Sequence, residues 1–394
     1  MYLCNQVLAS SDEEMAKRRM LAEWETQSAV QLTWPHKDTD WAPMLSDITA
    51  VYEQMAREIS QREQLIVVAP KGVQPHVSHG QLVTINTNDT WARDHGFISV
   101  EERDFSGGWR EKRGEWRVES GERIPDRQHN AAVEGRANTS LSSLLSPLST
   151  KNSPLSTKNS PLFLLDFKFN GWGEKFPAEL DNAINRQLFD CGIVQGTYEP
   201  HLDFVLEGGS IESDGQGTVF TTECCLMAPH RNQPLTKPDI EARLKQWLGA
   251  ERVVWLQHGS LIGDDTDGHI DTLVRICPHD TLLYIGADEA HPDLRLMEQE
   301  LQALRTVNGA PYRLLKLPLP RPIYDGDDRL PATYANYLVI NGAVLVPIYA
   351  QPDLDREACS IIQQAYPDRE IIGIDCRAII RQHGSLHCCT MQYY

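Results

Sequence analysis

A recurring pattern, an amphipathic helix followed by a short apolar strand, places the strongest constraint on the fold of this 394-residue chain. In each copy, apolar residues recur at helical spacing, and a polar or glycine turn leads into a short apolar run. The predicted helix and strand pairs are 48–59 with 65–68, 180–188 with 193–194, 240–248 with 253–256, 294–304 with 312–315, and 354–362 with 371–374. We therefore expect an α/β (α+β) protein built from five similar units.

The spacing of the units is regular except for one long gap. The predicted helices begin near residues 47, 179, 239, 293 and 353, so they are separated by 132, 60, 54 and 60 residues. The long gap contains a polar segment, 102–161, in which SPLSTKN occurs at 146–152 and again at 153–159. This composition favours neither a helix nor a core. We interpret 102–161 as a disordered, low-complexity surface insertion rather than a docking loop, and 1–19 as a variable N-terminal segment.

Hairpin-like sequence lies between the helix and strand pairs. The clearest example is 337–340 and 343–346, joined by an Asn341-Gly342 turn. Each unit then reads strand, strand, helix, strand. Five ββαβ units in a circular array would form one domain, 1–394, and would bring their connecting loops together around one axis. An ordinary α/β sandwich is the alternative.

Composition narrows the class of partner and the compartment. A formal net charge of −18 argues against nucleic acid and anionic membranes as partners and weakly favours a cationic small molecule. Nine cysteines without a C-x-x-C ladder indicate reduced thiols rather than a disulfide framework or zinc knuckle. No apolar run approaches the roughly 18 residues of a membrane span, and residues 1–20 lack a secretory apolar stretch. We expect a cytoplasmic protein.

Four polar clusters occur where apolar segments end, each in a different unit: 88–94, 207–210, 264–271 and 383–390. Together they supply thiols, histidines and several carboxylates. Such a set suits a thiol nucleophile and a proton-transferring histidine. Several carboxylates are tolerable together only beside a positive charge, and a carboxylate pair matches the planar, multi-donor face of a guanidinium. The clusters therefore predict a site for a cationic guanidino compound.

A metal site is the competing interpretation of 264–271. Asp265, Asp267 and Gly268 fit the third, fifth and sixth places of a calcium loop, but Gly263 and Val274 occupy the first and twelfth. That pattern excludes a calcium loop of this kind. Zinc bound by His269, Asp271 and Cys388 is disfavoured, because these residues lack the close spacing typical of zinc ligands.

Several separated motifs, in order, resemble the agmatine deiminase family, relatives of the bacterial peptidyl-arginine deiminases in the guanidino-group-modifying superfamily. They are EWE at 23–25 with TWPH at 33–36, WARDHG at 91–96, EGGS at 207–210, DTDGHID at 265–271 and HC at 387–388. The family's pentein fold, a five-unit ββαβ pseudo-propeller, agrees with the periodicity found independently in the sequence.

The resemblance implies a role for each matched residue. Cys388 is the expected nucleophile, His269 the general acid and base, and Asp94 and Asp271 the carboxylates that grip the guanidinium. Glu207 matches a further acidic, substrate-binding position. The implied reaction passes through a thiouronium intermediate on Cys388, from which water releases the product, and it needs neither a metal nor an organic cofactor.

Other polar residues carry weaker expectations. Trp91 is interpreted equally well as the pocket floor, in contact with substrate, or as core packing. Arg93 is expected to pair with acidic side chains, and His387 to be a hydrogen-bonded structural histidine rather than a second base. Asp265 and Asp267 are expected to shape the turn before His269.

The cysteines carry expectations of their own. Cys224 and Cys225 are predicted to be buried. Cys389 is predicted to face away from the site, because neighbours in extended backbone point in opposite directions. The family usually reaches its cysteine through a run of glycines, whereas only Gly384 is present here.

We expect hydrolysis of agmatine to N-carbamoylputrescine and ammonia, a step of putrescine and polyamine biosynthesis. Protein-arginine or free-arginine deiminase activity, amidino transfer on the same fold, and a guanidine-binding module without activity remain alternatives. Monomer and homodimer both remain open, as does the group that selects the substrate tail.

Overall fold

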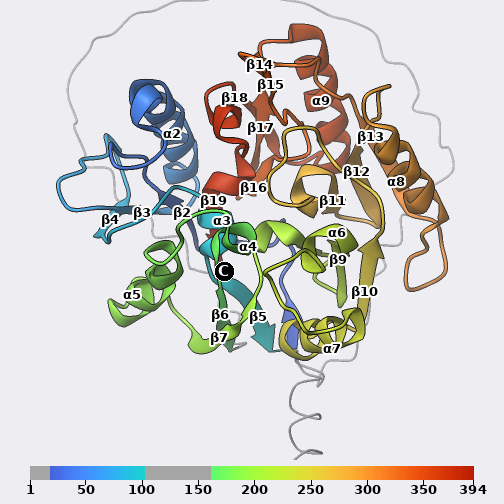
Figure 1. Ribbon diagram of the computed structural model, residues 1–394, viewed down its shortest axis with the longest axis horizontal. Helices are drawn as coiled ribbons and strands as arrows, with labels where there is room; N and C mark the ends of the chain where they lie inside the picture. The colour runs from blue at the N-terminus through green and yellow to red at the C-terminus, as the bar shows by residue number, and fades with distance from the viewer. Residues whose placement is uncertain (1–17, 103–160) are drawn as a thin grey trace, which may run out of the picture. The chain divides into compact units, whose positions relative to one another are not determined.

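Five ββαβ units form most of the computed structural model, which describes residues 18–102 and 161–394 (Figure 1). The first unit contains β19 (Thr390–Tyr393), β2 (Ala29–Thr33), α2 (Leu45–Ser60) and β3 (Gln64–Ala69), with β4 (Gln81–Thr84) beside β3. The second contains β5 (Ile98–Glu102), β6 (Leu162–Lys168), α5 (Ile184–Asp190) and β7 (Thr197–Val205), with β1 (Arg18–Met20) beside β5.

The remaining three units follow one another along the chain. The third contains β8 (Ile211–Ser213), β9 (Thr218–Thr222), α7 (Lys237–Leu248) and β10 (Arg252–Leu256). The fourth contains β11 (Val274–Cys277), β12 (Thr281–Ile285), α8 (Pro292–Ala303) and β13 (Arg313–Leu317). The fifth contains β16 (Leu338–Ile340), β17 (Ala343–Ile348), α9 (Pro352–Ala365) and β18 (Glu370–Asp375). A two-stranded ribbon, β14 (Tyr324–Asp325) with β15 (Asp328–Arg329), precedes the fifth unit.

Each unit has the same strand pairing. Two strands pair antiparallel, and the helix then returns the chain so that the last strand pairs parallel with the middle one. In the fifth unit, Val344 of β17 pairs with Val339 and with Ile371. Five of the six residues of β17 are buried, as expected of a strand with neighbours on both edges. Mixed sheets of three or four strands with helices packed against them are therefore the observed architecture.

Four of the five predicted helix and strand pairs are confirmed in place. The 337–346 hairpin is also confirmed, with Gly342 at φ 77° in its turn. The strand predicted at 193–194 is wrong, because that segment is a turn between Gly192 (φ 68°) and Gly196 (φ 148°). The strand of this unit is β7, which begins at Thr197. Most of β7 is exposed or half-buried, so it lacks the apolar pattern that marks the other strands.

Strand β19 joins the end of the chain to its beginning. It pairs antiparallel with β2, with Thr390 opposite Leu32 and Tyr393 opposite Ala29. A short turn, η6 (His387–Cys389), immediately precedes β19. The pairing therefore fixes Cys388 beside the first unit, although almost the whole sequence separates them.

The predicted insertion 102–161 lies outside the described residues except at its two ends, and so does 1–17 of the predicted N-terminal segment. The strands that flank the insertion, β5 and β6, pair with each other, with Ile98 opposite Leu165. None of the helices in 18–102 and 161–394 is long and apolar enough to cross a membrane.

Candidate active site

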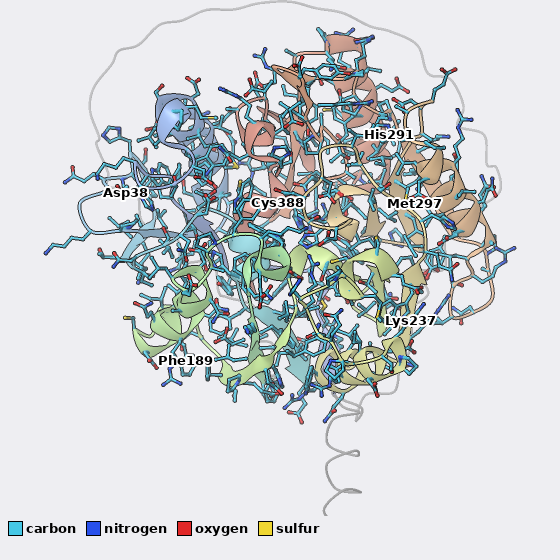
Figure 2. The ribbon with its side chains drawn as sticks, in the orientation of Figure 1. Asp38, Phe189, Lys237, His291, Met297 and Cys388 are labelled. Carbon is cyan, nitrogen blue, oxygen red and sulfur yellow. The ribbon has the colours of Figure 1, made fainter. Side chains whose placement is uncertain are left out.

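Residues from several units line a cavity of about 430 Å³ that contains Cys388. In Figure 2, Cys388 lies near the middle of the view, whereas Phe189, Lys237 and Met297, on helices of three different units, lie toward the rim. The lining residues are Asp40, Asp89, Trp91, Asp94, Trp172, Phe176, Gly263, Asp264, Asp265, Thr266, Gln382, His383, Gly384 and Cys388. Five are aspartates, and none of these described residues is an arginine or lysine. The cavity therefore presents a strongly acidic wall.

Cys388 is held by the turn η6. Its Sγ lies 3.4 Å from Asn336 Oδ1, which also accepts hydrogen bonds from the backbone N–H groups of His387 (2.9 Å) and Cys388 (3.3 Å). Burial, followed by the negative fields of Asp271 and Asp94, raises the pKa of Cys388 well above its usual value. The thiol form is therefore favoured until a positive charge offsets these carboxylates.

Cys389 does not reach the cavity. It is fully buried, and its thiol donates to Ser385 O at 3.4 Å. The expectation that only one of the two cysteines faces the cavity is met, but its stated reason is wrong. The backbone is a 3-10 turn over His387–Cys389 rather than extended.

Three predicted site residues converge on Gly209. A Cβ built on Gly209 would lie 2.6 Å from His269 Nδ1, 2.9 Å from Asp94 Oδ1 and 3.1 Å from Asp271 Oδ2. The neighbouring side chains could not tolerate that atom, so the close approach of backbone and site requires glycine here. His269 and Asp271 are fully buried beyond Asp94, which lines the cavity.

Asp94 lies in a short helix, α3 (Ala92–His95), and both its oxygens are held. Oδ1 accepts from Gly209 N, and Oδ2 accepts from the indole Nε1 of Trp172, each at 3.0 Å. Burial raises the pKa of Asp94, the charge of His269 opposes that rise, and Asp271 and Glu207 add to it. An additional cation beside Asp94 would relieve this unfavourable negative charge.

His269 lies next to Asp94, and its ring nitrogens are available for proton transfer. Its Nδ1 is 3.6 Å from Asp94 Oδ1, and neither ring nitrogen has a hydrogen-bond partner among the described residues. Burial lowers the pKa of His269, but the fields of Asp94, Cys225 and Glu207 outweigh burial and raise it well above its usual value. These neighbours therefore favour the imidazolium, the form that can donate a proton.

Asp271 lies in η4 (Ile270–Thr272) and has one held and one free oxygen. Its Oδ2 accepts from His387 Nδ1 at 2.7 Å, whereas Oδ1 is buried without a hydrogen-bond partner among the described residues. Burial would raise the pKa of Asp271, but the bond and charge of His387 lower it. An ionised, unpartnered carboxylate oxygen is ready to accept from a guanidinium N–H.

Glu207 faces an arginine that the sequence analysis did not identify. Arg231 Nε lies 3.0 and 3.3 Å from the two carboxylate oxygens, and both side chains are fully buried. Arg231 also bonds Asp267 Oδ2 at 2.6 Å and Thr266 O at 2.8 Å. Glu207 is not among the described residues that line the cavity. No local sequence pattern marks Arg231, since its partners come from distant segments.

The turn before His269 is shaped by a different aspartate from those predicted. Asp264 Oδ1 accepts from Thr266 N (3.2 Å) and Thr266 Oγ1 (2.6 Å), and Asp264 Oδ2 accepts from Gly268 N (2.7 Å). An Asx-type turn needs its carboxylate N-terminal to the N–H groups that it binds, which Asp264 provides. Asp267 instead pairs with Arg231 and Lys175, and Asp265 lines the cavity.

Trp91 belongs both to the cavity wall and to the core. It lines the cavity and is 5% exposed, and its ring packs against Trp41 and Trp172 at centroid distances of 5.7 and 6.4 Å. A Cβ on Gly384 would lie 2.0 Å from the Trp91 ring, which explains the single glycine before Cys388.

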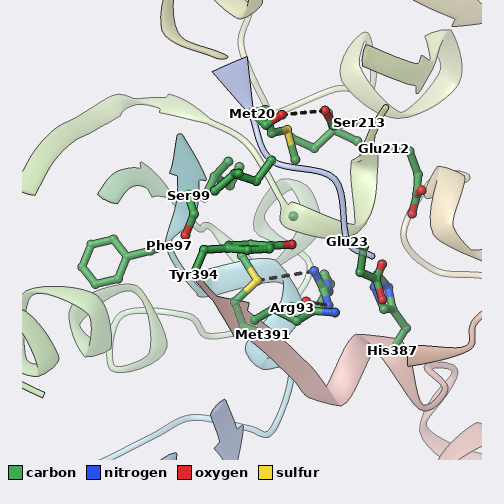
Figure 3. A pocket seen from close by; sticks show the side chains of 15 residues that line it. Met20, Glu23, Arg93, Phe97, Ser99, Glu212, Ser213, His387, Met391 and Tyr394 are labelled. Atoms are coloured by element: carbon green, nitrogen blue, oxygen red, sulfur yellow. Dashed lines mark hydrogen bonds and ion pairs between the residues drawn. The ribbon is translucent and has the colours of Figure 1, made fainter. Parts of the chain in front are cut away.

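Arg93 and Cys224 depart from prediction. Arg93 does not pair with an acid within the described part of the chain. Its guanidinium donates to Gln392 Oε1 and contacts Met391 Sδ at 3.5 Å, beside a separate cavity of about 50 Å³ (Figure 3). The neutral partners of Arg93 come from β19, almost 300 residues away in the sequence, so the residues around Arg93 could not indicate them. Cys225 is buried as expected, but Cys224 is exposed because it lies on the outer side of the short helix α6 (Glu223–Leu226), whose buried residues are Cys225 and Leu226.

One group of side chains could offer ligands to a metal. Atoms of Glu207, Cys225 and His269 lie within 4.8 Å of one another. This set differs from the zinc set considered from the sequence. Arg231 already bonds both oxygens of Glu207, so a metal ion would have to share that carboxylate with a guanidinium.

Comparisons with known proteins show the family to which the chain belongs. Residues 19–143 and 145–393 match the model of the Porphyromonas-type peptidyl-arginine deiminase family. A putative agmatine deiminase of Vibrio parahaemolyticus is 30% identical, with 94% of this chain and 95% of the relative covered.

Solved structures give the same result. A putative arginine deiminase from Porphyromonas gingivalis is 44% identical with a TM-score of 0.77, covering 96% of this chain and 98% of the other. A cysteine-to-serine variant of the agmatine deiminase of C. jejuni, with substrate bound, is 32% identical with a TM-score of 0.76, covering 96% of each chain. The chain is therefore an enzyme of the agmatine deiminase family, within the Porphyromonas-type peptidyl-arginine deiminases.

Proposed function

We propose that the protein hydrolyses the guanidino group of agmatine to N-carbamoylputrescine and ammonia. The observation that carries the proposal is the cavity at Cys388, lined by five aspartates and, among its described residues, by no arginine or lysine. Such a wall suits a substrate that is cationic at both ends. It offers nothing to the α-carboxylate of free arginine, which would need a cation. The similarity to agmatine deiminases gives further support.

In the proposed reaction, the guanidinium lies between Asp94 and the free oxygen of Asp271. Its charge offsets the carboxylate fields that keep Cys388 protonated, so the thiol loses its proton to solvent and the thiolate attacks the guanidinium carbon. His269, kept protonated by its acidic neighbours, gives its proton to the departing nitrogen and ammonia leaves. A thiouronium on Cys388 remains.

The second half of the reaction uses the same groups in reverse. Neutral His269 takes a proton from a water molecule, and the resulting hydroxide adds to the thiouronium carbon. Collapse of this adduct breaks the bond between the carbon and Cys388 Sγ, and the hydroxyl proton passes to the departing sulfur, which leaves the neutral ureido product and restores the thiol. Asp94 and Asp271 keep the reacting carbon in place through both steps, so no group outside the chain is required for orientation.

Peptidyl-arginine is the second candidate substrate. The matching family model is described as peptidyl-arginine deiminase, and a putative peptidyl-arginine deiminase of known structure is 33% identical with a TM-score of 0.79. A peptide-linked arginine also lacks a free α-carboxylate, so the acidic wall does not discriminate against it.

The test is a product assay with agmatine, free arginine and an arginyl peptide side by side, measuring ammonia and the carbamoyl product. Ammonia from agmatine at the highest kcat/KM supports the proposal. Release only from arginine or the peptide would overturn the substrate assignment. A new guanidino compound formed from agmatine and an added amine would instead indicate amidino transfer.

We also infer that the five units close into the pseudo-propeller expected from the sequence, as one catalytic domain. Pairing of β19 with β2 and the meeting of site residues from different units support this closure. A cytoplasmic location and a role in putrescine biosynthesis belong to the same proposal.

A further inference from the structure

A hydrogen-bonded series of ionisable side chains leads from Asp271 away from the cavity. His387 Nδ1 lies 2.7 Å from Asp271 Oδ2, and His387 Nε2 lies 3.0 Å from Glu23 Oε2. Arg275 bonds Glu23 through Nη2 and Glu212 Oε1 through Nε, the latter at 2.6 Å. Four of the five are buried, and the Glu23 side chain is only 12% exposed. Figure 3 shows Glu23 beside His387.

Glu23 and Arg275, which lie beyond His387 in this series, are bonded to backbone groups of β16 and of the segment before it. Glu23 Oε1 accepts from Val339 N at 2.8 Å. Arg275 Nη1 donates to the backbone carbonyls of Ala335, at 3.1 Å, and Tyr337. Glu23 is therefore fixed by backbone and by a buried cation, so it can hold the histidine ring in one orientation.

Both ring nitrogens of His387 lie at hydrogen-bond distance from carboxylate oxygens. Each nitrogen faces a carboxylate oxygen, and an ionised carboxylate can only accept. Arg275 Nη2 also lies 3.3 Å from Nε2, but it is directed at Glu23 and a guanidinium cannot accept. The ring thus lies between the carboxylates of Asp271 and Glu23. The structural interpretation of His387 made from the sequence fits this geometry, but the partner that it holds belongs to the site.

The ring determines which Asp271 oxygen is available. His387 occupies Oδ2, which leaves Oδ1 without a partner among the described residues. The backbone N–H of His387 and that of Cys388 share Asn336 Oδ1 as their acceptor. The same short segment therefore positions both the carboxylate and the thiol.

We propose that His387 is a positioning residue for the deimination reaction: bonded to Glu23 on one side, it holds Asp271 so that one oxygen faces the guanidinium. The inference rests on the proposed function, because it assigns Asp271 to the substrate. His387 itself is not expected to touch substrate.

Two isosteric substitutions separate the bonds of the ring. The amide nitrogen of an asparagine occupies the place of Nδ1, so His387→Asn keeps a donor toward Asp271. The amide nitrogen of a glutamine occupies the place of Nε2, so His387→Gln keeps a donor toward Glu23 only. Loss of a hydrogen bond to a charged group costs about tenfold or more in binding. We expect KM for agmatine to rise about tenfold or more in H387Q and H387A, and by about threefold or less in H387N.

A pH profile gives an independent measurement. The charged and titratable groups that face Asp271 are His387, His269, Arg275, Asp94 and Cys388. Since the bond and charge of His387 lower the pKa of Asp271, its removal lets Asp271 take up a proton at higher pH. The acid limb of kcat/KM should move to higher pH and become steeper in H387Q, less so in H387N.

Asp166→Asn is the matched control for loss of a buried hydrogen-bonded group. Asp166 accepts hydrogen bonds from Asn185 and Tyr198, each at 2.8 Å, within the second unit, and neither partner belongs to the site. The variant should lower the melting temperature without moving KM or the acid limb. Equal KM rises in H387N and H387Q, or an unmoved acid limb in H387Q, would overturn the inference.

A binding measurement distinguishes failure of the proposed function from failure of the role assigned to His387. Agmatine binding to the native protein and to the two isosteric variants can be measured by calorimetry whether or not turnover occurs. Tighter binding to H387N than to H387Q supports the role of His387 even if no product forms. Equal affinities in the two variants would contradict it.

Discussion

At the scale of single residues, unbalanced negative charge defines the site. Asp94 is buried with its pKa raised, and Cys388 is held as a thiol by burial and by the neighbouring carboxylates. These arrangements are unfavourable in the protein alone, and a guanidinium relieves both. The residues that carry the proposed chemistry are therefore complementary to a cation rather than to each other.

The two adjacent cysteines should differ in reactivity. Cys388 lies on the cavity, whereas Cys389 is enclosed and donates to Ser385 O. We expect Cys388→Ala to abolish agmatine turnover and Cys389→Ala to retain most of it. Steady-state assays of both variants, with circular dichroism to confirm folding, provide the measurement. Comparable loss in the two variants would contradict the assignment of the nucleophile.

Alkylation of Cys388 by iodoacetamide should depend on pH with a midpoint above the ordinary thiol value of 9.0, because its pKa is raised. The thiolate is the reactive form, so the rate at neutral pH should be low and should increase as pH rises. Peptide mass spectrometry distinguishes Cys388 from exposed Cys191 and Cys224. Rapid modification of Cys388 at pH 7 without ligand would be inconsistent with this electrostatic description.

Gly209 is required by the packing of the site. An added Cβ would meet His269 Nδ1 at 2.6 Å and Asp94 Oδ1 at 2.9 Å. Since displacement of reacting groups by about 1 Å can cost about a hundredfold in rate, we expect such a fall in kcat/KM for Gly209→Ala. Gly80→Ala, whose Cβ would come no closer than 3.2 Å to any neighbouring atom, is the control. Near-native activity of Gly209→Ala would show that the three groups have more room than the structure gives them.

At the scale of elements, capping residues and apolar patterns within short segments specify most of the helices and strands. Helix α7 begins with a capping box between Thr236 and Asp239 and ends at Gly249 with φ 65°. These signals are readable in the sequence because both partners lie within one turn. Strand β7 carried no such signal, since its position follows from pairing with β6 and not from its own residues.

Removal of the α7 cap should destabilise the protein modestly. Thr236→Ala leaves the N–H of Asp239 without its side-chain acceptor, which costs about 1 kcal/mol. Thr236→Ser keeps the hydroxyl and should remain close to native stability. Chemical denaturation of both variants measures the difference, and equal midpoints would indicate that the cap does not contribute.

At the scale of the whole molecule, the candidate site exists only because separate units meet. Asp94 comes from the segment before β5, Asp271 and His269 from the loop before β11, and Cys388 from the turn before β19. Ligand binding should therefore stabilise several units together. Agmatine at about 100 times its Kd should stabilise the inactive Cys388→Ala protein by about 2.7 kcal/mol.

Differential scanning calorimetry of Cys388→Ala with agmatine tests this coupling. Putrescine, which has the amine ends without a guanidinium, is the matched ligand and should raise the melting temperature less. Equal shifts with both compounds would indicate binding at the outer aspartates alone, without engagement of Asp94 and Asp271.

The repeating unit, four of its five helix and strand pairs, and the residue types at the loops could be predicted from the sequence, because these features depend on spacing along the chain. The partners of the buried charges could not be predicted, because they are set by packing between distant segments. Arg231 on Glu207, and His387 between Asp271 and Glu23, join segments far apart in sequence. In a buried site, the state of each ionisable group depends on the neighbours that the fold supplies, and spacing along the chain does not record those neighbours.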